Sequence, residues 1–409
     1  MFFSQKIDAI FLCDIIKKRK RGYPEEKERG DGMDLTAEIK TILPELEELA
    51  RKLHAMPEIS FEEYNTTSLI EDYCRSCGAE ILNVGLKTGV IAWLDCGRED
   101  TVALRADIDA VLLDDGTCAH VCGHDYHTAS LIGAMKVLCA KKEELPHNVL
   151  FIFQPAEEFT KGADYVLSCG LMEKIPQKPT VLFGTHNRPE LPFGTIGVKN
   201  GGLMAENTTF EIDIHGRTGH PGAPNQCIDP IVAAAAVING TQTIISRNCD
   251  PFDPCVCSVC SVNSGNKENF APEIAELSGS IRTLSHEAHL RIIERLKELT
   301  EESAKAYNCT SEIRLRREVP AVFNGKRETA MARAAAEATV GRDNVVDPRA
   351  CLASEDFAVF GEVMPAFLYW IGSGVEGEVN HPWHHADFRV PEGYIAISVK
   401  LFVNSVLLS

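Results

Sequence analysis

One short segment, rich in side chains that bind metals, constrains this chain more than any other. It reads His120-Val-Cys-Gly-His-Asp-Tyr-His127 and precedes a predicted helix over residues 128–138. Only Gly123 separates Cys122 from His124, and glycine lets the backbone turn tightly enough for both side chains to face one point. Thiolate and imidazole are ligands that zinc and similar divalent metals accept. No second pair of ligands follows directly, so we expect the remaining ligands of a catalytic centre to come from distant parts of the chain.

The composition is typical of a soluble globular protein. Of 409 residues, 44% are hydrophobic and 24% are charged, and this length predicts about two domains. The formal net charge of -18 argues against nucleic acid as a partner. The 15 cysteines do not indicate a disulfide framework, because a chain of this length can bury an apolar core. We therefore expect reduced thiols and a cytoplasmic protein.

Residues 1–32 differ from the rest of the chain. An apolar run containing acidic residues precedes Lys17-Lys-Arg-Lys-Arg21, whereas a signal peptide carries its positive charge first. The run is too short and too acidic to cross a bilayer, which leaves an anchor at the membrane surface as the alternative. Our hypothesis is that the native protein starts at Met33 and that residues 1–32 form an extension outside it. Native peptides upstream of Met33, found by mass spectrometry, would contradict this hypothesis.

From Met33 onward, predicted helices alternate with short apolar strands. The first helix, over residues 35–53, is expected to be interrupted by Pro44. Continuous apolar strands separated by helices indicate a largely parallel sheet that is covered on both faces, and therefore an α/β fold. The predicted strands are 89–95, 101–105, 148–153, 180–184 and 366–371.

Residues that can bind a metal follow four of these strands. They are Asp107 and Asp109, Glu157 and Glu158, His186, and the late histidines His381, His384 and His385. Sites in open α/β sheets form outside the carboxyl ends of the strands. A single histidine at a strand end is usually part of the polar surface. Four strand ends that all carry possible metal ligands indicate a metal site instead. We therefore expect the loops to bring together Asp107, Cys122, His124, Glu158, His186 and a late histidine.

The pattern changes between Gly202 and about Arg316, where strands alternate between apolar and polar residues. Two predicted helices on an antiparallel sheet would form a compact α+β unit. Cys255-Val-Cys-Ser-Val-Cys260 looks like a metal motif, but it lies in an extended run where cysteine serves as a small buried residue. We expect a catalytic metal-binding domain over 33–202 and 317–409, with a lid or dimerisation domain inserted over 203–316.

The adjacent pair Glu157 and Glu158 indicates the chemistry of the site. Neighbouring residues on an extended loop point in different directions, so one carboxylate can hold a metal while the other faces the substrate. The free carboxylate can take a proton from a metal-activated water and return it to a leaving amine. The alternative is that both are surface carboxylates that cap a helix near Lys161.

At this level of detail the chain resembles the metal-dependent aminoacylase/carboxypeptidase superfamily. The resemblance runs from about Arg51 to Phe402 and is strongest for the branch with hippurate hydrolase, N-acyl amino acid amidohydrolases and indole-acetyl-amino-acid hydrolases. The matching motifs are Arg51-Lys-Leu-His54, Leu104-Arg-Ala-Asp-Ile-Asp-Ala110, the segment His120–His127, Phe153-Gln-Pro-Ala-Glu-Glu158, Gly184-Thr-His186, Gly219-His220-Pro221, Gly279-Ser-Ile-Arg-Thr283 and Ser354-Glu-Asp-Phe357.

The resemblance implies two divalent metal ions, zinc or manganese, bridged by the thiolate of Cys122. The further metal ligands it implies are His124, Glu158, His186 and one late histidine, with His384 the best match and His385 the alternative. It also implies that Glu157 is the general base and that His220 reaches over from the smaller domain to stabilise the oxyanion. Asn269 and Arg282 would hold the carboxylate of the substrate.

Two features depart from the family pattern. Residues 111–118 form a shorter stretch than usual before the metal-ligand segment, and Tyr126 stands where glycine is usual. We expect the shorter stretch to influence specificity and Tyr126 to add bulk close to the metals.

The function implied is hydrolysis of the amide bond of N-acyl or N-aroyl amino acids, which gives a carboxylic acid and a free amino acid. A dipeptidase or carboxypeptidase that uses the same site is the first alternative. A catalytically silent metal-binding protein that captures amino-acid conjugates is the second. The expected partners are a small-molecule substrate and a second copy of the chain, which would form a homodimer through the inserted domain.

Overall fold

The computed structural model describes residues 35–113, 115–266 and 268–409. The predictions for residues 1–32 lie outside the described residues. Within the described ranges, no helix combines the length and the hydropathy that crossing a bilayer requires.

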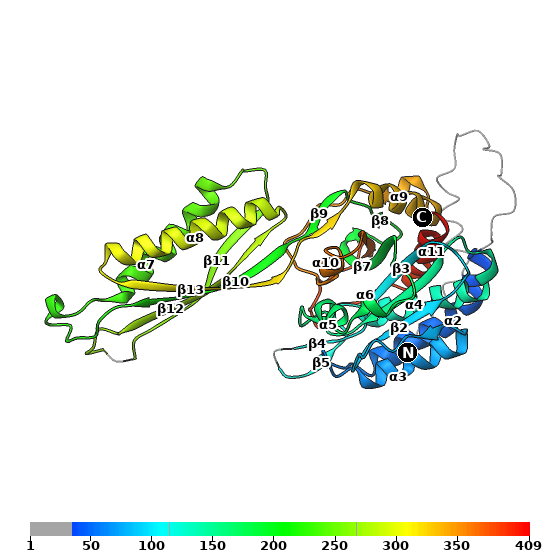
Figure 1. Cartoon of the computed structure of the whole chain (residues 1–409), viewed down its shortest axis with the longest axis horizontal. Helices are drawn as coiled ribbons and strands as arrows, with labels where there is room; N and C mark the ends of the chain where they lie inside the picture. The colour runs from blue at the N-terminus through cyan, green and yellow to red at the C-terminus, as the bar shows by residue number, and fades with distance from the viewer. Residues whose placement is uncertain (1–34, 114, 267) are drawn as a thin grey trace. The chain divides into compact units, whose positions relative to one another are not determined.

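The larger sheet has eight strands in the order β1-β2-β6-β3-β7-β16-β8-β15 (Figure 1). Its central strands β6, β3, β7 and β16 run parallel, which confirms the largely parallel α/β prediction. Every residue of β3, β6 and β16 is buried, as expected for strands covered on both faces. The strands are β1 (Glu80–Ile81), β2 (Val90–Leu94), β3 (Thr101–Asp107), β6 (Asn148–Gln154), β7 (Val181–Pro192), β8 (Ile196–Gly197), β15 (Val345–Val346) and β16 (Ala366–Gly374).

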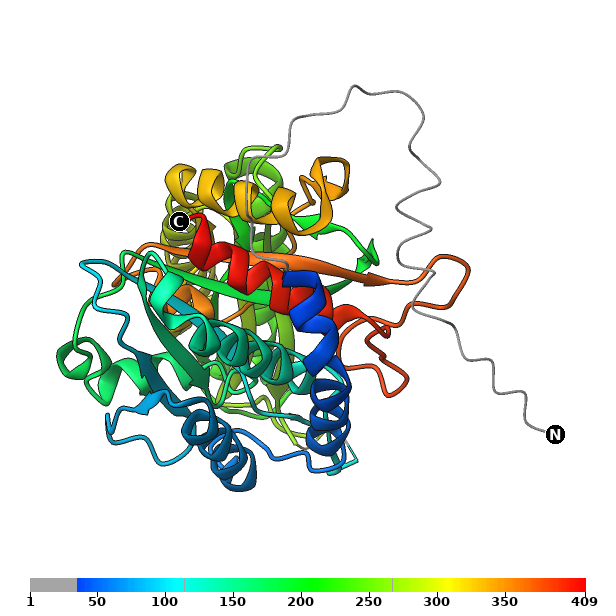
Figure 2. The same cartoon turned by 90° about the vertical axis from the view of Figure 1, so that its right-hand side faces the viewer.

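Helices cover the two faces of this sheet. On one face, α4 and α11 lie side by side (Figure 2). A carbon added to Gly133 of α4 would lie 2.5 Å from Leu46 of α2 and 2.6 Å from Val399 of α11, so these three helices pack closely. The other face carries α5, α6 and α10, which share one apolar cluster with the strands. The helices are α2 (Leu35–His54), α3 (Tyr64–Cys77), α4 (His124–Ala140), α5 (Gly162–Ser168), α6 (Leu171–Lys174), α9 (Lys326–Val340), α10 (Phe357–Phe360) and α11 (Tyr394–Leu407).

The helix α2 continues through Pro44, where we had expected an interruption. Proline removes one hydrogen bond of the helix but leaves the apolar face on either side intact. Leu46, Leu49 and Leu53 are fully buried along that face. Packing of this face therefore outweighs the local cost of the proline.

The smaller sheet is antiparallel, with the order β11-β12-β10-β13, and lies within residues 206–319. Its helices α7 and α8 begin after the capping residues Asp229 and Ser285 and share a separate apolar core with the strands. The elements are β10 (Glu206–His215), α7 (Pro230–Asn248), β11 (Cys255–Ser264), β12 (Ile274–Thr283), α8 (His286–Ala306) and β13 (Thr310–Val319). The exact division into domains stays a prediction.

The cysteines of β11 follow our interpretation only in part. Cys257 is buried in the core between the sheet and its helices, as expected. Cys260 is exposed, because side chains alternate along a strand and residue 260 faces the side opposite to Cys255, Cys257 and Val259. Among the described residues, none of these cysteines belongs to a group that could hold a metal ion.

Short hairpins complete the fold. The segment 111–118, which is shorter than in the family, forms β4 (Val111–Leu112), paired with β5 (Cys118–Ala119). A second pair joins β9 (Gly201–Met204) to β14 (Val322–Asn324).

The position of His186 differs from the prediction. We expected it after a strand that ends at Gly184, but β7 continues to Pro192 and His186 lies within it. Pairing between β7 and β3 stops at Gly184, whereas pairing with β16 continues along the other edge. His186 therefore lies just past the line where β3 ends, beside the loops that follow β3 and β6.

Candidate metal centre

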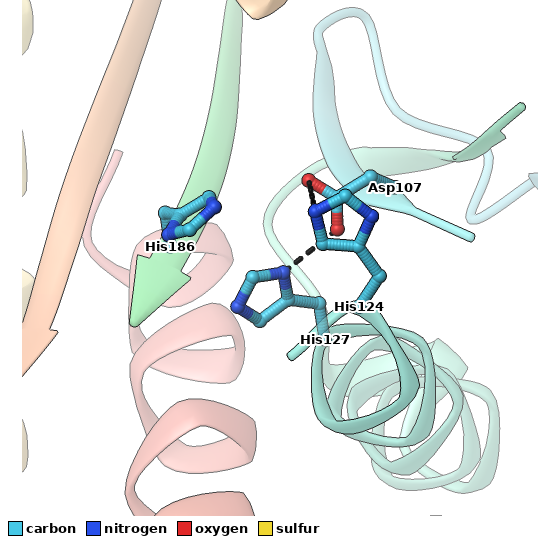
Figure 3. A group of neighbouring side chains, drawn as sticks. All are labelled: Asp107, His124, His127 and His186. Carbon is cyan, nitrogen blue, oxygen red and sulfur yellow. Dashed lines mark hydrogen bonds and ion pairs between the residues drawn. The ribbon is translucent and has the colours of Figure 1, made fainter. Parts of the chain in front are cut away.

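Three predicted ligands meet beyond the carboxyl ends of β3 and β6. The ligand atoms of Cys122, His124 and Glu158 lie within 4.8 Å of one another. A second group, formed by the side chains of Asp107, His124, His127 and His186, satisfies the same criterion and shares His124 (Figure 3). The segment before α4, the loop after β6 and the strand β7 thus supply neighbouring ligands, as the sequence predicted.

The imidazole of His124 is oriented with one nitrogen toward the cluster. Its Nδ1 lies 3.0 Å from the backbone oxygen of Asp109 and must donate, because a carbonyl oxygen only accepts. The lone pair of Nε2 then faces Oε1 of Glu158, at 3.8 Å, and Oε2 of Glu157, at 4.0 Å. A backbone carbonyl that fixes the tautomer in this way is typical of histidines that bind metals.

A backbone carbonyl also orients the imidazole of His186. Its Nδ1 donates to the backbone oxygen of Asn187 at 2.8 Å, which leaves the lone pair of Nε2 free. That atom lies 3.6 Å from Sγ of Cys122. Burial, followed by the neighbouring His127, holds the pKa of His186 well below its usual value, so the ring is neutral as a metal ligand must be.

The late histidine that reaches the cluster is His384. Its Nε2 lies 3.3 Å from Oε2 of Glu158, and its backbone is in the left-handed region, with φ of 66°. His385 instead stacks on His381 and accepts a hydrogen bond from the backbone of Asp387. A non-glycine residue at positive φ is often held there for function, which favours His384 as the ligand.

Glu157 and Glu158 point to different partners. Glu158 faces His124 and His384, whereas the oxygens of Glu157 lie within 4.8 Å of those of Glu355 and Asp356. The two follow Ala156, whose φ of 57° makes this segment a tight turn where we had predicted an extended loop. Burial, then the carboxylate of Glu355, raises the pKa of Glu157 well above its usual value.

The electrostatics of the cluster favour a positive charge at its centre. Although burial opposes protonation, the carboxylate of Asp107 and a hydrogen bond with Asp109 raise the pKa of His124 to about 10. Burial, then the carboxylates of Glu158 and Glu157, raises the pKa of the Cys122 thiol well above its usual value. A thiolate therefore needs a cation beside it here.

Orphaned polar atoms test whether a metal ion fits these residues. Nε2 of His124 and Oε1 of Glu158 are buried without a hydrogen-bond partner among the described residues, and so is Oδ1 of Asp109. Buried polar atoms are rarely left unpaired. Imidazole, carboxylate and thiol are together the donor set of zinc and manganese sites, so the residues present fit a metal ion.

A buried arginine stabilises the acidic side of the cluster. The guanidinium of Arg105 is fully buried and bonds to Asp107 at 2.8 Å, Glu355 at 2.9 Å and Asp356 at 3.2 Å. It also donates to Gln154, which in turn donates to Asp356. No role was predicted for Arg105, Glu355 or Asp356, although a charged residue within an apolar strand is a signal of a buried ion pair.

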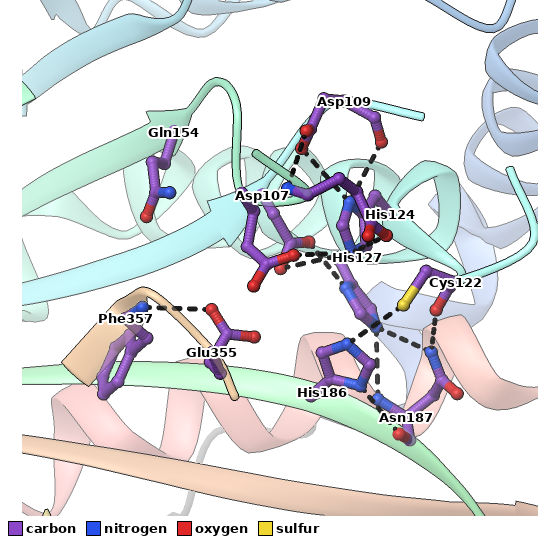
Figure 4. Close-up of polar contacts among 12 residues, drawn as sticks. Asp107, Asp109, Cys122, His124, His127, Gln154, His186, Asn187, Glu355 and Phe357 are labelled. Atoms are coloured by element: carbon purple, nitrogen blue, oxygen red, sulfur yellow. Dashed lines mark hydrogen bonds and ion pairs between the residues drawn. The ribbon is translucent and has the colours of Figure 1, made fainter. Parts of the chain in front are cut away.

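The side chain of Asn187 connects three segments that carry ligands. Its Nδ2 donates to the backbone oxygen of Cys122 and lies 3.2 Å from Nε2 of His127 (Figure 4). Its Oδ1 accepts a hydrogen bond from Nε1 of Trp383, next to His384, at 3.0 Å. We had missed Asn187, because a contact of this kind is visible only once the fold is known.

Glycine at position 123 is required by this arrangement. Its φ is 94°, and an added side-chain carbon would lie 2.5 Å from Nδ2 of Asn187. The predicted tight turn between Cys122 and His124 is therefore present.

The predicted residues of the smaller sheet are not brought to the cluster in this structure. His220 is exposed, and its Nδ1 accepts a hydrogen bond from the backbone of Gly222. Asn269 is also exposed. Arg282 donates to the backbone oxygen of Leu352 and to Ser354, in the segment before Glu355. Their assigned roles stay predictions.

We had expected Tyr126 to add bulk beside the ligands, but its side chain lies elsewhere. Its ring packs edge-on against Tyr394, and its side chain lines a cavity together with Arg51 and Arg389. The reason is that Tyr126 lies in the first turn of α4, two positions beyond His124, where helical geometry directs it to a different side.

Comparisons with known proteins agree with this geometry. The family model "Peptidase family M20/M25/M40" matches residues 103–407. N-acetylcysteine deacetylase of Bacillus subtilis is 39% identical over 369 residues, which cover 87% of this chain and 94% of the relative. An IAA-amino acid hydrolase of Arabidopsis thaliana is 31% identical, with 84% and 80% covered. The crystal structure of a Bacillus subtilis protein described as a dinuclear metal binding peptidase from the M20 family matches with a TM-score of 0.79 and 35% identity, covering 90% of this chain and 98% of that one.

The fold and these matches define a hydrolytic enzyme that acts on amide bonds. The chain belongs to peptidase family M20/M25/M40. The resemblance described from the motifs is thereby confirmed.

Proposed function

We propose that this protein hydrolyses the amide bond of N-acyl amino acids and releases a carboxylic acid and a free amino acid. The observation that carries the proposal is the buried carboxyl group of Glu157, which lies beside ligand atoms of His124 and Glu158 that lack a hydrogen-bond partner among the described residues. Relatives named as N-acetylcysteine deacetylase and N-acetyldiaminopimelate deacetylase support the substrate class.

Two divalent metal ions, zinc or manganese, complete the proposed site. The residues that would hold them are Cys122, His124, Glu158, His186 and His384. The sulfur of Cys122 lies 3.6 Å from Nε2 of His186 and within 4.8 Å of ligand atoms of His124 and Glu158, which suits a bridging ligand. When bound, such ions polarise the amide carbonyl and make water more acidic.

Glu157 would act as the general base. Its carboxylate is buried and is not one of the three residues whose ligand atoms cluster around Cys122. It would take the proton of the attacking water and deliver it to the nitrogen of the leaving amino acid. The neighbouring Glu355 and Asp356, which are fixed by Arg105, keep this carboxylate in a confined position.

The smaller sheet and its helices would serve as a lid. In this proposal residues 203–316 form the inserted domain, through which two chains associate as a homodimer. His220 would stabilise the oxyanion, while Asn269 and Arg282 would bind the carboxylate of the substrate. Reduced cysteines support a cytoplasmic location.

A substrate panel on protein of measured metal content tests the proposal. The panel contains N-acetyl amino acids, the N-aroyl amino acid hippurate, and dipeptides with a free amino group. Faster turnover of the acylated compounds is expected. Preference for dipeptides would identify the dipeptidase alternative, and no turnover of any compound by metal-loaded protein would contradict the proposal.

A further inference from the structure

A cavity separate from the ligand cluster lies behind the segment His120–His127. It has a volume of about 170 Å³ and is formed where the end of α2, the start of α4 and the loop before α11 meet. The cavity is lined by charged, imidazole and aromatic side chains, namely those of Arg51, His54, His120, Tyr126, Phe388 and Arg389. None of them is among the proposed metal ligands or the proposed catalytic residues.

A buried histidine in this cavity lacks partners. The side chain of His120 is only 3% exposed, yet neither of its ring nitrogens has a hydrogen-bond partner among the described residues. Leaving a buried polar group unpaired costs free energy, so such groups usually bond to a protein atom, a water molecule or a ligand. Its ring lies 6.4 Å from that of His54, so two imidazoles face this space together.

The charges around the cavity favour an anion. Its one carboxylate, Asp125, is already engaged, because it accepts from Nδ1 of His54 at 2.8 Å and from the backbone of Tyr126. Arg389 bonds only to backbone oxygens among the described residues and has no acidic partner there. Arg51 contributes less, because it pairs with Glu48 on the surface of α2.

The remaining walls of the cavity are apolar. They are formed by the side chains of Ala50, Ala55, Phe388 and Val390 and by the ring of Tyr126. A ligand that suits both the polar and the apolar part of the cavity carries an anionic group for Arg389 and the imidazoles, and a small hydrocarbon body for the apolar walls.

We propose that this cavity binds a small organic carboxylate at a site distinct from the metal centre. The carboxylate accepts hydrogen bonds from the guanidinium of Arg389 and from a ring N–H of His120. Its hydrocarbon part packs on Tyr126 and Phe388.

Calorimetric titration of the metal-loaded enzyme with benzoate tests this proposal. Three forms are compared: the unchanged protein, Arg389→Gln, and the control Arg349→Gln, which removes an exposed arginine that likewise has no ion pair among the described residues. We expect saturable binding, about tenfold weaker in Arg389→Gln and unchanged in the control, because the variant loses a charge-assisted hydrogen bond. Benzamide, which lacks the charge, is expected not to bind.

Crystals soaked with 4-bromobenzoate locate the binding site. An anomalous bromine peak between Tyr126 and Phe388 is expected. A peak at the metal centre alone, equal benzoate affinity in both variants, or no saturable binding would each overturn the proposal. Titration with acetate measures how much the hydrocarbon body contributes, and affinity equal to that of benzoate would overturn the role assigned to Tyr126 and Phe388.

Discussion

Nε2 of His384 lies 3.3 Å from Oε2 of Glu158, although the two residues belong to loops that follow different strands. Its neighbour His385 stacks on His381 instead, so the structure distinguishes two adjacent histidines that the sequence pattern left as alternatives.

We therefore predict different effects of two single substitutions. His384→Ala should lower turnover by at least about 100-fold and reduce the metal content, because it removes a ligand. His385→Ala, the matched control, should keep both within about twofold of the unchanged enzyme. Turnover on an N-acyl amino acid and metal analysis of the purified proteins measure this. The reverse order of effects would assign the ligand to His385.

The contacts of Asn187 predict a role in positioning. Asn187→Ala removes the bonds to the Cys122 backbone and to Trp383, and it leaves Nε2 of His127 with only the backbone N–H of residue 187 as a donor. Loss of groups that orient ligands typically lowers metal affinity about 10–100-fold. We expect a loss of this size in competition with a metal-binding dye.

Asn344→Ala is the control for this experiment, because Asn344 bonds only to the backbone of Val340 near the end of α9. It should leave metal affinity unchanged. Equal metal affinity in Asn187→Ala and the unchanged protein would show that Asn187 does not position the metal ligands.

The buried guanidinium of Arg105 predicts a large effect on stability. Arg105→Met leaves Asp107, Glu355 and Asp356 buried without their cation, and breaking a buried pair in this way costs about 3–5 kcal/mol. Arg314→Met, which breaks surface pairs between β13 and β10, should cost much less, because exposed ion pairs contribute little to stability. Unfolding by urea compares the free energies, and equal losses would contradict the role of Arg105.

A histidine of helix α8, which packs on the smaller sheet, predicts a dependence of stability on pH. His289 is buried between Thr208 and Thr283, and burial lowers its pKa. The unfolded chain protonates this imidazole near pH 6.5, whereas the folded chain does not until lower pH. The stability that it contributes is therefore present above pH 6.5 and is lost as the pH falls below that value, by up to about 1.4 kcal/mol per pH unit.

The variant His289→Gln, which cannot take up this proton, is compared with the unchanged protein by urea unfolding at pH 7.5 and 5.5. The unchanged protein should lose more stability between these two values. Equal losses would show that His289 is protonated alike in the folded and unfolded states.

Much of the fold follows from local patterns. Strands β2 and β6 lie within one residue of their predicted bounds at each end, because both are continuous apolar runs with clear ends. The course of β7 past Gly184 was missed, because its residues after His186 include Arg188 and Glu190, which lack the apolar signal of a strand. That part of β7 is instead held by pairing with β16, a contact between distant segments.

The residues of the site, too, could be predicted from the sequence only in part. Cys122, His124 and Glu158 could be found from sequence, because ligand types clustered after predicted strands. The roles of Asn187 and Arg105 could not, since each depends on contacts with segments far away in the chain. The direction of Tyr126 required the helix α4 to begin at His124, earlier than predicted.

The most direct test of the account is the metal content and the turnover of Glu157→Gln, measured on the same preparation with an N-acyl amino acid. The account predicts two divalent ions per chain, as in the unchanged enzyme, and turnover lower by about 100-fold or more, because the proton acceptor is lost while the ligands remain. Unchanged turnover would contradict it.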